Sequence, residues 1–97
     1  MLEVGGWNIQ TGYHCTAVKP SKTNVEVGEL FDITAGVTET FLDGSRVSLL
    51  VDGEPADSKW AWARRDKTDE VLFKLSLSKP GVHRLTVGNG KAEVIVK

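Results

Sequence analysis

Two tryptophans and an arginine alternate along one short stretch of the sequence and are its clearest candidates for binding. Trp60, Trp62 and Arg64 lie two residues apart, so in a β-strand they share one face. Ala61 and Ala63 then occupy the other face. If the alanines face the core, the aromatic strip faces outward, where it could stack on a sugar ring or a protein partner. The opposite orientation buries at least one tryptophan between two sheets. Sandwiches commonly carry such a residue, and we favour this arrangement.

The histidines and aspartates do not form a recognisable metal motif. His14 and His83 are the two histidines, and neither lies in a Cys-x-x-Cys or His-x-x-x-His context. We expect His83 to be a partly buried core residue. The loop aspartates lack the alternating oxygen-ligand spacing of a calcium loop, and turn chemistry explains two of them. They are Asp43, Asp52, Asp57, Asp66 and Asp69. We therefore expect no metal and no cofactor.

The chain also lacks the usual catalytic signatures. It contains no G-x-S-x-G motif and no glycine-rich phosphate loop before a helix. Cys15 has no local nucleophile context and is expected to be a small core residue. A carboxylate pair for glycoside hydrolysis needs a cleft, and a small sandwich has few spare loops to build one. The sequence favours a protein that is not an enzyme.

Composition limits the classes of partner. The 97 residues suit one domain, and twelve basic and thirteen acidic residues give a formal charge of −1. This balance offers no electrostatic case for nucleic acid or an anionic membrane. A single cysteine excludes an intrachain disulfide. No apolar run approaches the roughly 20 residues that span a bilayer, and residues 1–10 lack the basic and apolar regions of a signal peptide.

Alternating hydrophobicity predicts strands along almost the whole chain. Val71, Phe73, Leu75 and Leu77 alternate with a second set of residues, which places one apolar stripe on one face of a strand. The second set is Leu72, Lys74, Ser76 and Ser78. About seven such segments recur at roughly ten-residue spacing, separated by glycine, proline and aspartate turns. This pattern predicts an all-β, immunoglobulin-like β-sandwich of about seven antiparallel strands in two sheets with Greek-key connections. A small closed barrel is the alternative.

The pattern also predicts domain bounds, a core and two turns. Residues 13–97 form the sandwich, and residues 1–12 are an N-terminal arm or edge strand. Tyr13, Cys15 and Ala17 should share one face of the first strand. Gly53 and Gly90 should adopt positive φ in hairpin turns. Six side chains should be buried together between the sheets: Ile33, Leu49, Phe73, Leu75, Leu85 and Val94.

Several segments resemble the CARDB-type domains, which are cell-adhesion-related immunoglobulin-like modules of bacterial and archaeal surface proteins. They are Val18-Lys19-Pro20-Ser21, Val25-Glu26-Val27-Gly28-Glu29, the strand at 31–37, the hairpin around Val51-Asp52-Gly53, and the segment at 79–87 that begins Lys79-Pro80-Gly81. The likeness covers about residues 16–97. Thr38 to Phe41 replaces the family's usual N-x-G, and His83 replaces an aromatic residue. The resemblance implies a seven-stranded sandwich with a structural, spacing or binding role, and it supplies no functional residues.

Three functional hypotheses follow. The first is a non-catalytic structural or adhesive module of a cell-surface protein, as the resemblance implies. The second is a standalone accessory protein that decorates a virus particle, which suits a chain that starts at Met1 without a signal peptide. The third is a carbohydrate-binding module that uses Trp60 and Trp62. The expected location is extracellular or the cell surface for a secreted chain, and the virion surface for a standalone one.

The chain has more large apolar residues than the core of one sandwich can bury, and this predicts an interface. These residues lie in the arm, a loop and a predicted edge strand, and they are Trp7, Ile9, Phe41, Leu42 and one of the two strand tryptophans. A single sandwich has limited interior, so some of them should form an exposed patch, and such patches usually mark interfaces. We expect self-association or docking on a larger assembly, mediated partly by residues 1–12, which could pair with a neighbour's open sheet edge.

Overall fold

The computed structural model describes residues 13–41, 44–63 and 67–97. These residues form eight β-strands. The strands are β1 (His14–Pro20), β2 (Asn24–Val25), β3 (Phe31–Thr38), β4 (Ser45–Val51), β5 (Glu54–Ala61), β6 (Asp69–Leu75), β7 (Gly81–Val87) and β8 (Gly90–Val96). The two-residue β2 is the strand beyond the predicted seven. The part of the chain that the structure describes includes no helix able to cross a membrane.

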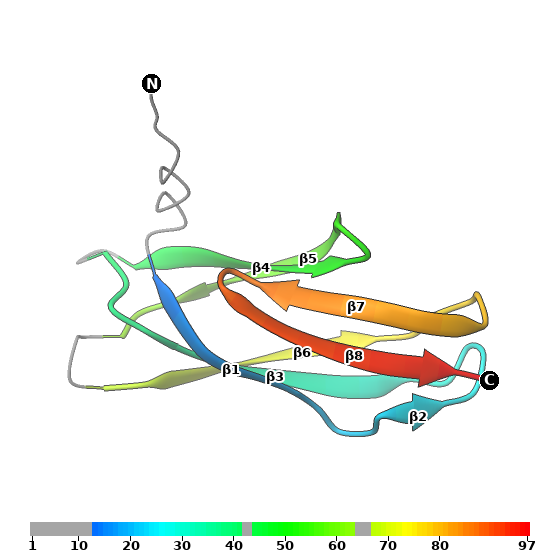
Figure 1. Cartoon of the computed structure of the whole chain (residues 1–97). Coiled ribbons are helices and arrows are strands. Elements are labelled where there is room, and N and C mark those ends of the chain that lie inside the picture. The colour runs from blue at the N-terminus through cyan, green and yellow to red at the C-terminus, as the bar shows by residue number, and fades with distance from the viewer. Residues whose placement is uncertain (1–12, 42–43, 64–66) are drawn as a thin grey trace.

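The strands form two sheets that pack face to face (Figure 1). One sheet has the order β1-β3-β6 and the other the order β2-β8-β7-β4-β5. The chain passes between the sheets after β1, β2, β3, β5 and β6, which places most neighbours in sequence in different layers. The pairings are antiparallel except for β2 with β8, which is parallel. The predicted immunoglobulin-like β-sandwich is therefore confirmed.

Alternation places one apolar stripe from each long strand between the sheets. Ile33 and Phe73 are cross-strand partners on β3 and β6, and both are fully buried. Leu49, Leu85 and Val94 are also fully buried and close the core from the other sheet. Leu75 is only partly buried against this cluster because it is the last residue of β6. Five of the six predicted core side chains thus lie at its centre, and one lies at its margin.

The β4–β5 hairpin has the predicted turn. Asp52 has a φ of 52° and Gly53 a φ of 86°, and positive φ at both central residues defines a type I′ turn. The prediction for Gly90 is wrong. Gly90 pairs with Val87 as the first residue of β8, and the positive φ of 57° belongs to Gly88.

A bulge corrects the predicted faces of β1. The register shifts between Cys15 and Ala17, so Cys15 and Val18 are buried while Ala17 is only partly so. A β-bulge adds one residue to a strand and moves later side chains to the opposite face. Cys15 N donates to Asn89 Oδ1 at 2.7 Å, and Asn89 Nδ2 donates to Cys15 O at 2.9 Å. The amide side chain thus joins the β7–β8 turn to β1.

His83 is partly buried, as expected, but it links elements rather than filling the core. Its Nδ1 lies 2.6 Å from Asp52 Oδ2 and its Nε2 lies 2.7 Å from the carbonyl oxygen of Lys79. Both ring nitrogens face oxygen acceptors, an arrangement that favours the doubly protonated ring. The hydrogen bond to the Lys79 carbonyl, followed by that to Asp52, raises the pKa of His83 above its ordinary value. Asp52 also accepts from Arg84 N at 2.9 Å, which holds the β4–β5 hairpin against β7.

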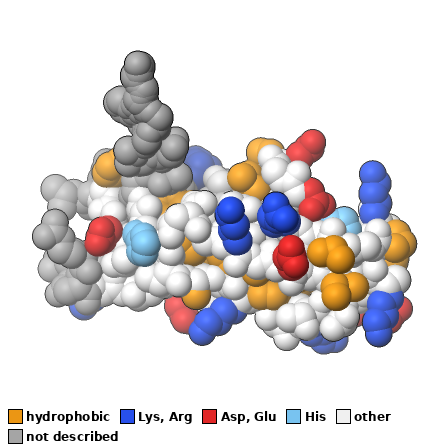
Figure 2. Space-filling view, in the orientation of Figure 1, with side chains coloured by type: hydrophobic (Ala, Val, Ile, Leu, Met, Phe, Trp, Pro, Cys, Tyr) orange, Lys and Arg blue, Asp and Glu red, His pale blue; other side chains and the backbone are white. Residues whose placement is uncertain are grey.

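The outer face of β7 and β8 carries charges of both signs. Figure 2 shows basic and acidic side chains beside hydrophobic ones over this part of the molecule. Arg84 and Glu93 are cross-strand partners with a distance of 3.9 Å between Nη2 and Oε2. Val82 and Ile95 are paired further along the same strands and are exposed. The face therefore has mixed charge rather than a basic patch.

Candidate functional site

Trp60 of the edge strand β5 and Trp62, just after it, both point outward. Ala61 and Ala63 are 1% and 7% exposed, whereas Trp60 and Trp62 are 47% and 61% exposed. The favoured expectation that at least one tryptophan is buried is wrong. The small alanines fit where β5 approaches the core, and the two buried phenylalanines, on β3 and β6, supply its large aromatic side chains. Sequence alternation predicted the shared face but not which face would be inside.

The two indole rings contact each other and a glycine. Their centroids are 6.0 Å apart with an interplanar angle of 67°, an edge-to-face arrangement. A Cβ atom at Gly44 would lie 2.7 Å from Trp62 Nε1 and closer still to Trp60 Nε1. Gly44 also has a φ of 95°, so both the backbone and the close approach require glycine. The rings are therefore held by their surroundings.

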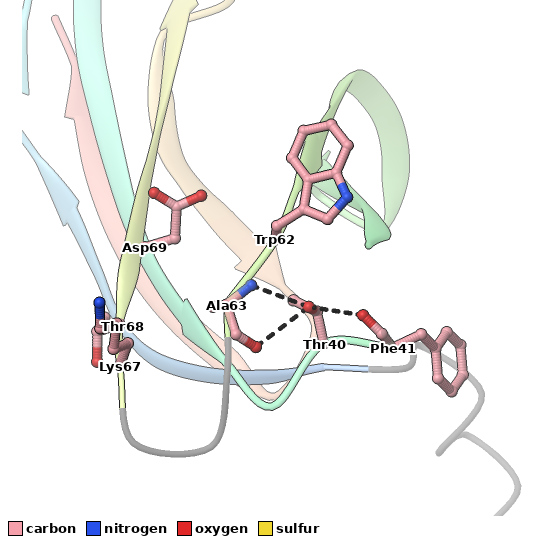
Figure 3. Close-up of a pocket in the computed structure, with 7 residues that line it drawn as sticks. All are labelled: Thr40, Phe41, Trp62, Ala63, Lys67, Thr68 and Asp69. Carbon is pink, nitrogen blue, oxygen red and sulfur yellow. Dashed lines mark hydrogen bonds between the residues drawn. The ribbon is translucent and has the colours of Figure 1, made fainter. Parts of the chain in front are cut away.

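Phe41 completes this aromatic surface, which we define as Phe41, Trp60 and Trp62. Phe41 is 59% exposed and lies in the loop after β3. Thr40 N donates to Ala63 O at 2.9 Å, and Ala63 N donates to Thr40 Oγ1 at 2.9 Å. Phe41 N donates to Ser45 Oγ at 3.1 Å. These bonds tie the loop to the end of β5 and place Phe41 at the cleft that Trp62 also lines, with the Phe41 ring directed away from Trp62 (Figure 3).

Two open clefts flank the aromatic surface, with volumes of about 490 and 460 Å³. Phe41 lines both. The first cleft has Trp62 on one side and the start of β6, with Lys67, Thr68 and Asp69, on the other (Figure 3). The second has Trp60, Tyr13, Arg46 and Leu50 among its lining residues. The arrangement offers aromatic faces beside a few polar groups and suits binding.

The structure brings together three of the six predicted binding residues. Phe41, Trp60 and Trp62 form one surface, while Trp7, Ile9 and Arg64 lie outside the described residues, as do the whole predicted arm of residues 1–12 and Leu42. Sequence reasoning missed Tyr13 and Asp69 as cleft residues. Nothing in their local sequence signals this role, because each reaches its cleft through the packing of one sheet on the other. The binding role of the six residues stays a prediction.

Metal-ligating side chains are dispersed in the described ranges. Within them, no group of three or more His, Cys, Asp or Glu side chains could hold a metal ion. Burial raises the pKa of the Cys15 thiol, and the side chain is buried in the core. A raised pKa disfavours the nucleophilic thiolate. This environment fits the core role expected for Cys15.

Comparison with known proteins identifies the fold. No family model and no curated protein matches the sequence. Among solved structures, a crystal structure of the CARDB domain of a Pyrococcus furiosus protein, in complex with di-metal ions, matches with a TM-score of 0.73 and 14% identity. The match covers 88% of this chain and 87% of that one. A solution structure of the same domain matches with a TM-score of 0.65 and 15% identity, covering 88% and 94%.

The chain has the CARDB-type fold. The resemblance carried by the Val-Asp-Gly hairpin and the Lys-Pro-Gly strand is thereby confirmed at the level of fold. A β-glucosidase from Erythrobacter marinus also matches, with a TM-score of 0.73 and 13% identity, over 88% of this chain but 15% of the enzyme. This fold thus corresponds to a small part of that enzyme chain. Identities this low show the fold alone.

Proposed function

We propose that this CARDB-type domain is a non-catalytic structural or adhesive module that binds a protein partner through its aromatic surface. The observation that carries the proposal is the joint exposure of Phe41, Trp60 and Trp62 on neighbouring elements. Tryptophan is enriched among the residues that dominate binding energy at protein interfaces. A contiguous exposed aromatic group on a small domain usually marks such an interface.

The rigidity of the surface supports the proposal. Trp60 lies in a strand, paired with Arg46 of β4, and Phe41 is fixed by the hydrogen bonds of its loop. Docking would therefore lose little conformational freedom, which improves affinity for a given contact. Each aromatic side chain that becomes fully buried contributes roughly 1.5–3 kcal/mol before the cost of association is subtracted. Three such side chains are enough for a specific contact of modest affinity.

The N-terminal arm of residues 1–12 belongs to the same proposal. The described chain begins at Tyr13, which lines the second cleft together with Trp60. The arm carries Trp7 and Ile9, and in this proposal these apolar side chains add to the contact made by the aromatic surface. In a cell-surface protein this region would serve adhesion or spacing. In a virus decoration protein it would bind the protein to the virus particle. A long secreted reading frame or neighbouring capsid and tail genes would separate these two settings.

Site-specific photo-cross-linking in the native cells or particles tests the proposal. A photoreactive amino acid replaces Trp62 in one variant and Leu72 in a control variant. Leu72 is 45% exposed on β6, in the opposite sheet. We expect a defined protein adduct from position 62 and none from position 72. Equal labelling from both positions, or no adduct from position 62, would refute docking at the aromatic surface.

A second candidate ligand class, carbohydrate, is favoured by the geometry of the first cleft. Trp62 lies on one side of this cleft and Asp69, at the start of β6, lies on the other (Figure 3). A sugar ring can stack its apolar face on an indole while a carboxylate accepts from its hydroxyl groups. The 67° angle between the indoles limits stacking to one ring at a time. Binding to a glycan array that is lost in Trp62→Ala and kept in Leu72→Ala would support this candidate, and an array without binding would exclude it.

A further inference from the structure

The open edge of β5 is the surface with the clearest self-complementarity. β5 ends the order of the five-stranded sheet and pairs with β4 on one side. On its other side, no strand among the described residues pairs with it. An unpaired edge offers backbone N–H and C=O groups to another strand. We propose that the domain forms a two-fold dimer in which β5 pairs antiparallel with β5 of a second copy, centred on Ser58.

The hydrogen bonding of Ser58 supports this centre. Its N–H donates to the carboxylate of its neighbour Asp57, at 2.8 Å from Oδ1, although Ser48 of β4 lies directly opposite. In an antiparallel pair, alternate residues direct their backbone groups away from the partner strand. The Ser58 N–H is therefore directed to the open edge. In the dimer it would donate to the Ser58 carbonyl of the second copy, and the Asp57 carboxylate would be released.

The charges of β5 select this register. Asp57 and Lys59 lie opposite the buried Leu49 and Val47 of β4, yet both are exposed. In the described part of the chain neither forms a salt bridge. Centring the dimer on Ser58 sets Asp57 of each copy opposite Lys59 of the other. Centring it on either neighbour would oppose two aspartates or two lysines, which is destabilising.

The same register accounts for an exposed tryptophan. Pairing about Ser58 brings Trp60 of each copy opposite Ala56 of the other, a residue small enough to lie beside an indole ring. Arg46 Nη1 donates to Ser58 Oγ at 3.1 Å, so the centre of the contact is already ordered in one copy. Pro55 and the irregularity beside Leu49 and Leu50 end the pairing beyond Ala56, because proline and bulges interrupt ladders. The pairing is therefore short.

This dimer rests on the proposed function, since it uses part of the aromatic surface and names a second copy as its partner. The remaining aromatic residues, Phe41 and Trp62, lie beyond the paired segment and stay accessible. Ala63, which follows β5, and Asp69 of β6 line one cleft beyond the paired segment. Asp57 and Lys59 are exposed and Ser58 between them is partly exposed, so this edge can accept a strand.

Charge reversal with mixing tests the dimer, using sedimentation equilibrium of the full chain. Asp57→Lys gives a chain with two lysines at the edge, and Lys59→Asp gives one with two aspartates. We expect each variant to dimerise at least about tenfold more weakly than the natural chain, because both cross-strand pairs become repulsive. An equimolar mixture should form a heterodimer, and the double variant should regain homodimers. Both positions are exposed, and circular dichroism of each variant checks its fold.

Two outcomes would overturn the inference. One is a natural chain that stays monomeric up to millimolar concentration, and the other is a mixture that associates no better than its two components. Neither of these sedimentation results would change the interpretation of the photo-cross-linking at position 62, because that experiment detects a protein partner of any kind. Conversely, dimers that respond to charge as expected, with no adduct from position 62, would retain the edge pairing and reject the wider docking function.

Discussion

The contact of Gly90 with β1 makes a quantitative prediction about one methyl group. A Cβ atom at Gly90 would lie 2.6 Å from Cys15 Sγ and 2.8 Å from Val18 Cγ2. Both neighbours are buried in the core, so neither can turn into solvent. Favourable contacts between such atoms need about 3.5–4.0 Å, so the β7–β8 hairpin and β1 would have to separate by about 1 Å.

We expect Gly90→Ala to lower the free energy of unfolding by about 1–3 kcal/mol, the usual cost of forcing extra volume into a packed core. Urea denaturation measures this change directly. Thermal unfolding should show a fall of about 4–8 °C for each kcal/mol lost in a domain of this size. Gly90 is absent from the residues with positive φ. The loss should therefore come from overlap and not from backbone strain.

A double-mutant cycle separates these two causes. Cys15→Ala removes Sγ and leaves the Cys15 Cβ position at 3.3 Å from the added methyl group. In that background the penalty for Gly90→Ala should shrink by at least about 0.5 kcal/mol, since the two sites touch. Gly53→Ala is the control, because Gly53 has a φ of 86° and open space around its Cβ position. Its penalty should be the same in both backgrounds. An unchanged penalty for Gly90→Ala would refute the packing argument.

Further predictions concern the core, the hairpin, pH and the arm. Phe73→Ala should cost about 3–5 kcal/mol in urea denaturation, because the side chain is fully buried; a loss under about 1 kcal/mol would contradict its placement. Gly53→Val should destabilise the domain more than Gly53→Ala does, since a β-branched residue fits positive φ poorly; equal stability would disprove the turn type. The raised pKa of His83 implies stability that is fully present below its unfolded value of 6.5 and lost as pH rises through the higher folded value. The natural chain should therefore lose stability over that range relative to His83→Gln, and parallel pH profiles would show that its bond to Asp52 does not favour the charged ring. Removing residues 1–12 should lower the association constant in sedimentation, and equal constants would exclude a role for the arm.

The sequence by itself determined the architecture of this protein. Alternating apolar residues such as Ile33 and Phe73 identify strands with one buried face, because successive side chains of a strand point to opposite sides. Asp52-Gly53 determined the hairpin between β4 and β5, since those residue types tolerate positive φ. These are local properties, and neighbours in the chain are enough to establish them.

The tertiary structure alone decided which face of β5 is inside and which strands lie at the edges. The sequence pattern allows either Trp60 or Ala61 to be the buried residue. A period of two identifies two faces of a strand, but it does not show whether the alanine face or the tryptophan face points into the core. The order of the sheet places β5 at its end, where little of the opposite sheet covers it, so the large rings stay outside. Gly90 also depends on the tertiary structure. A side chain at this position would overlap with Cys15, which is distant in the sequence. Burial and close approach are properties of residues distant in sequence, which no local pattern encodes.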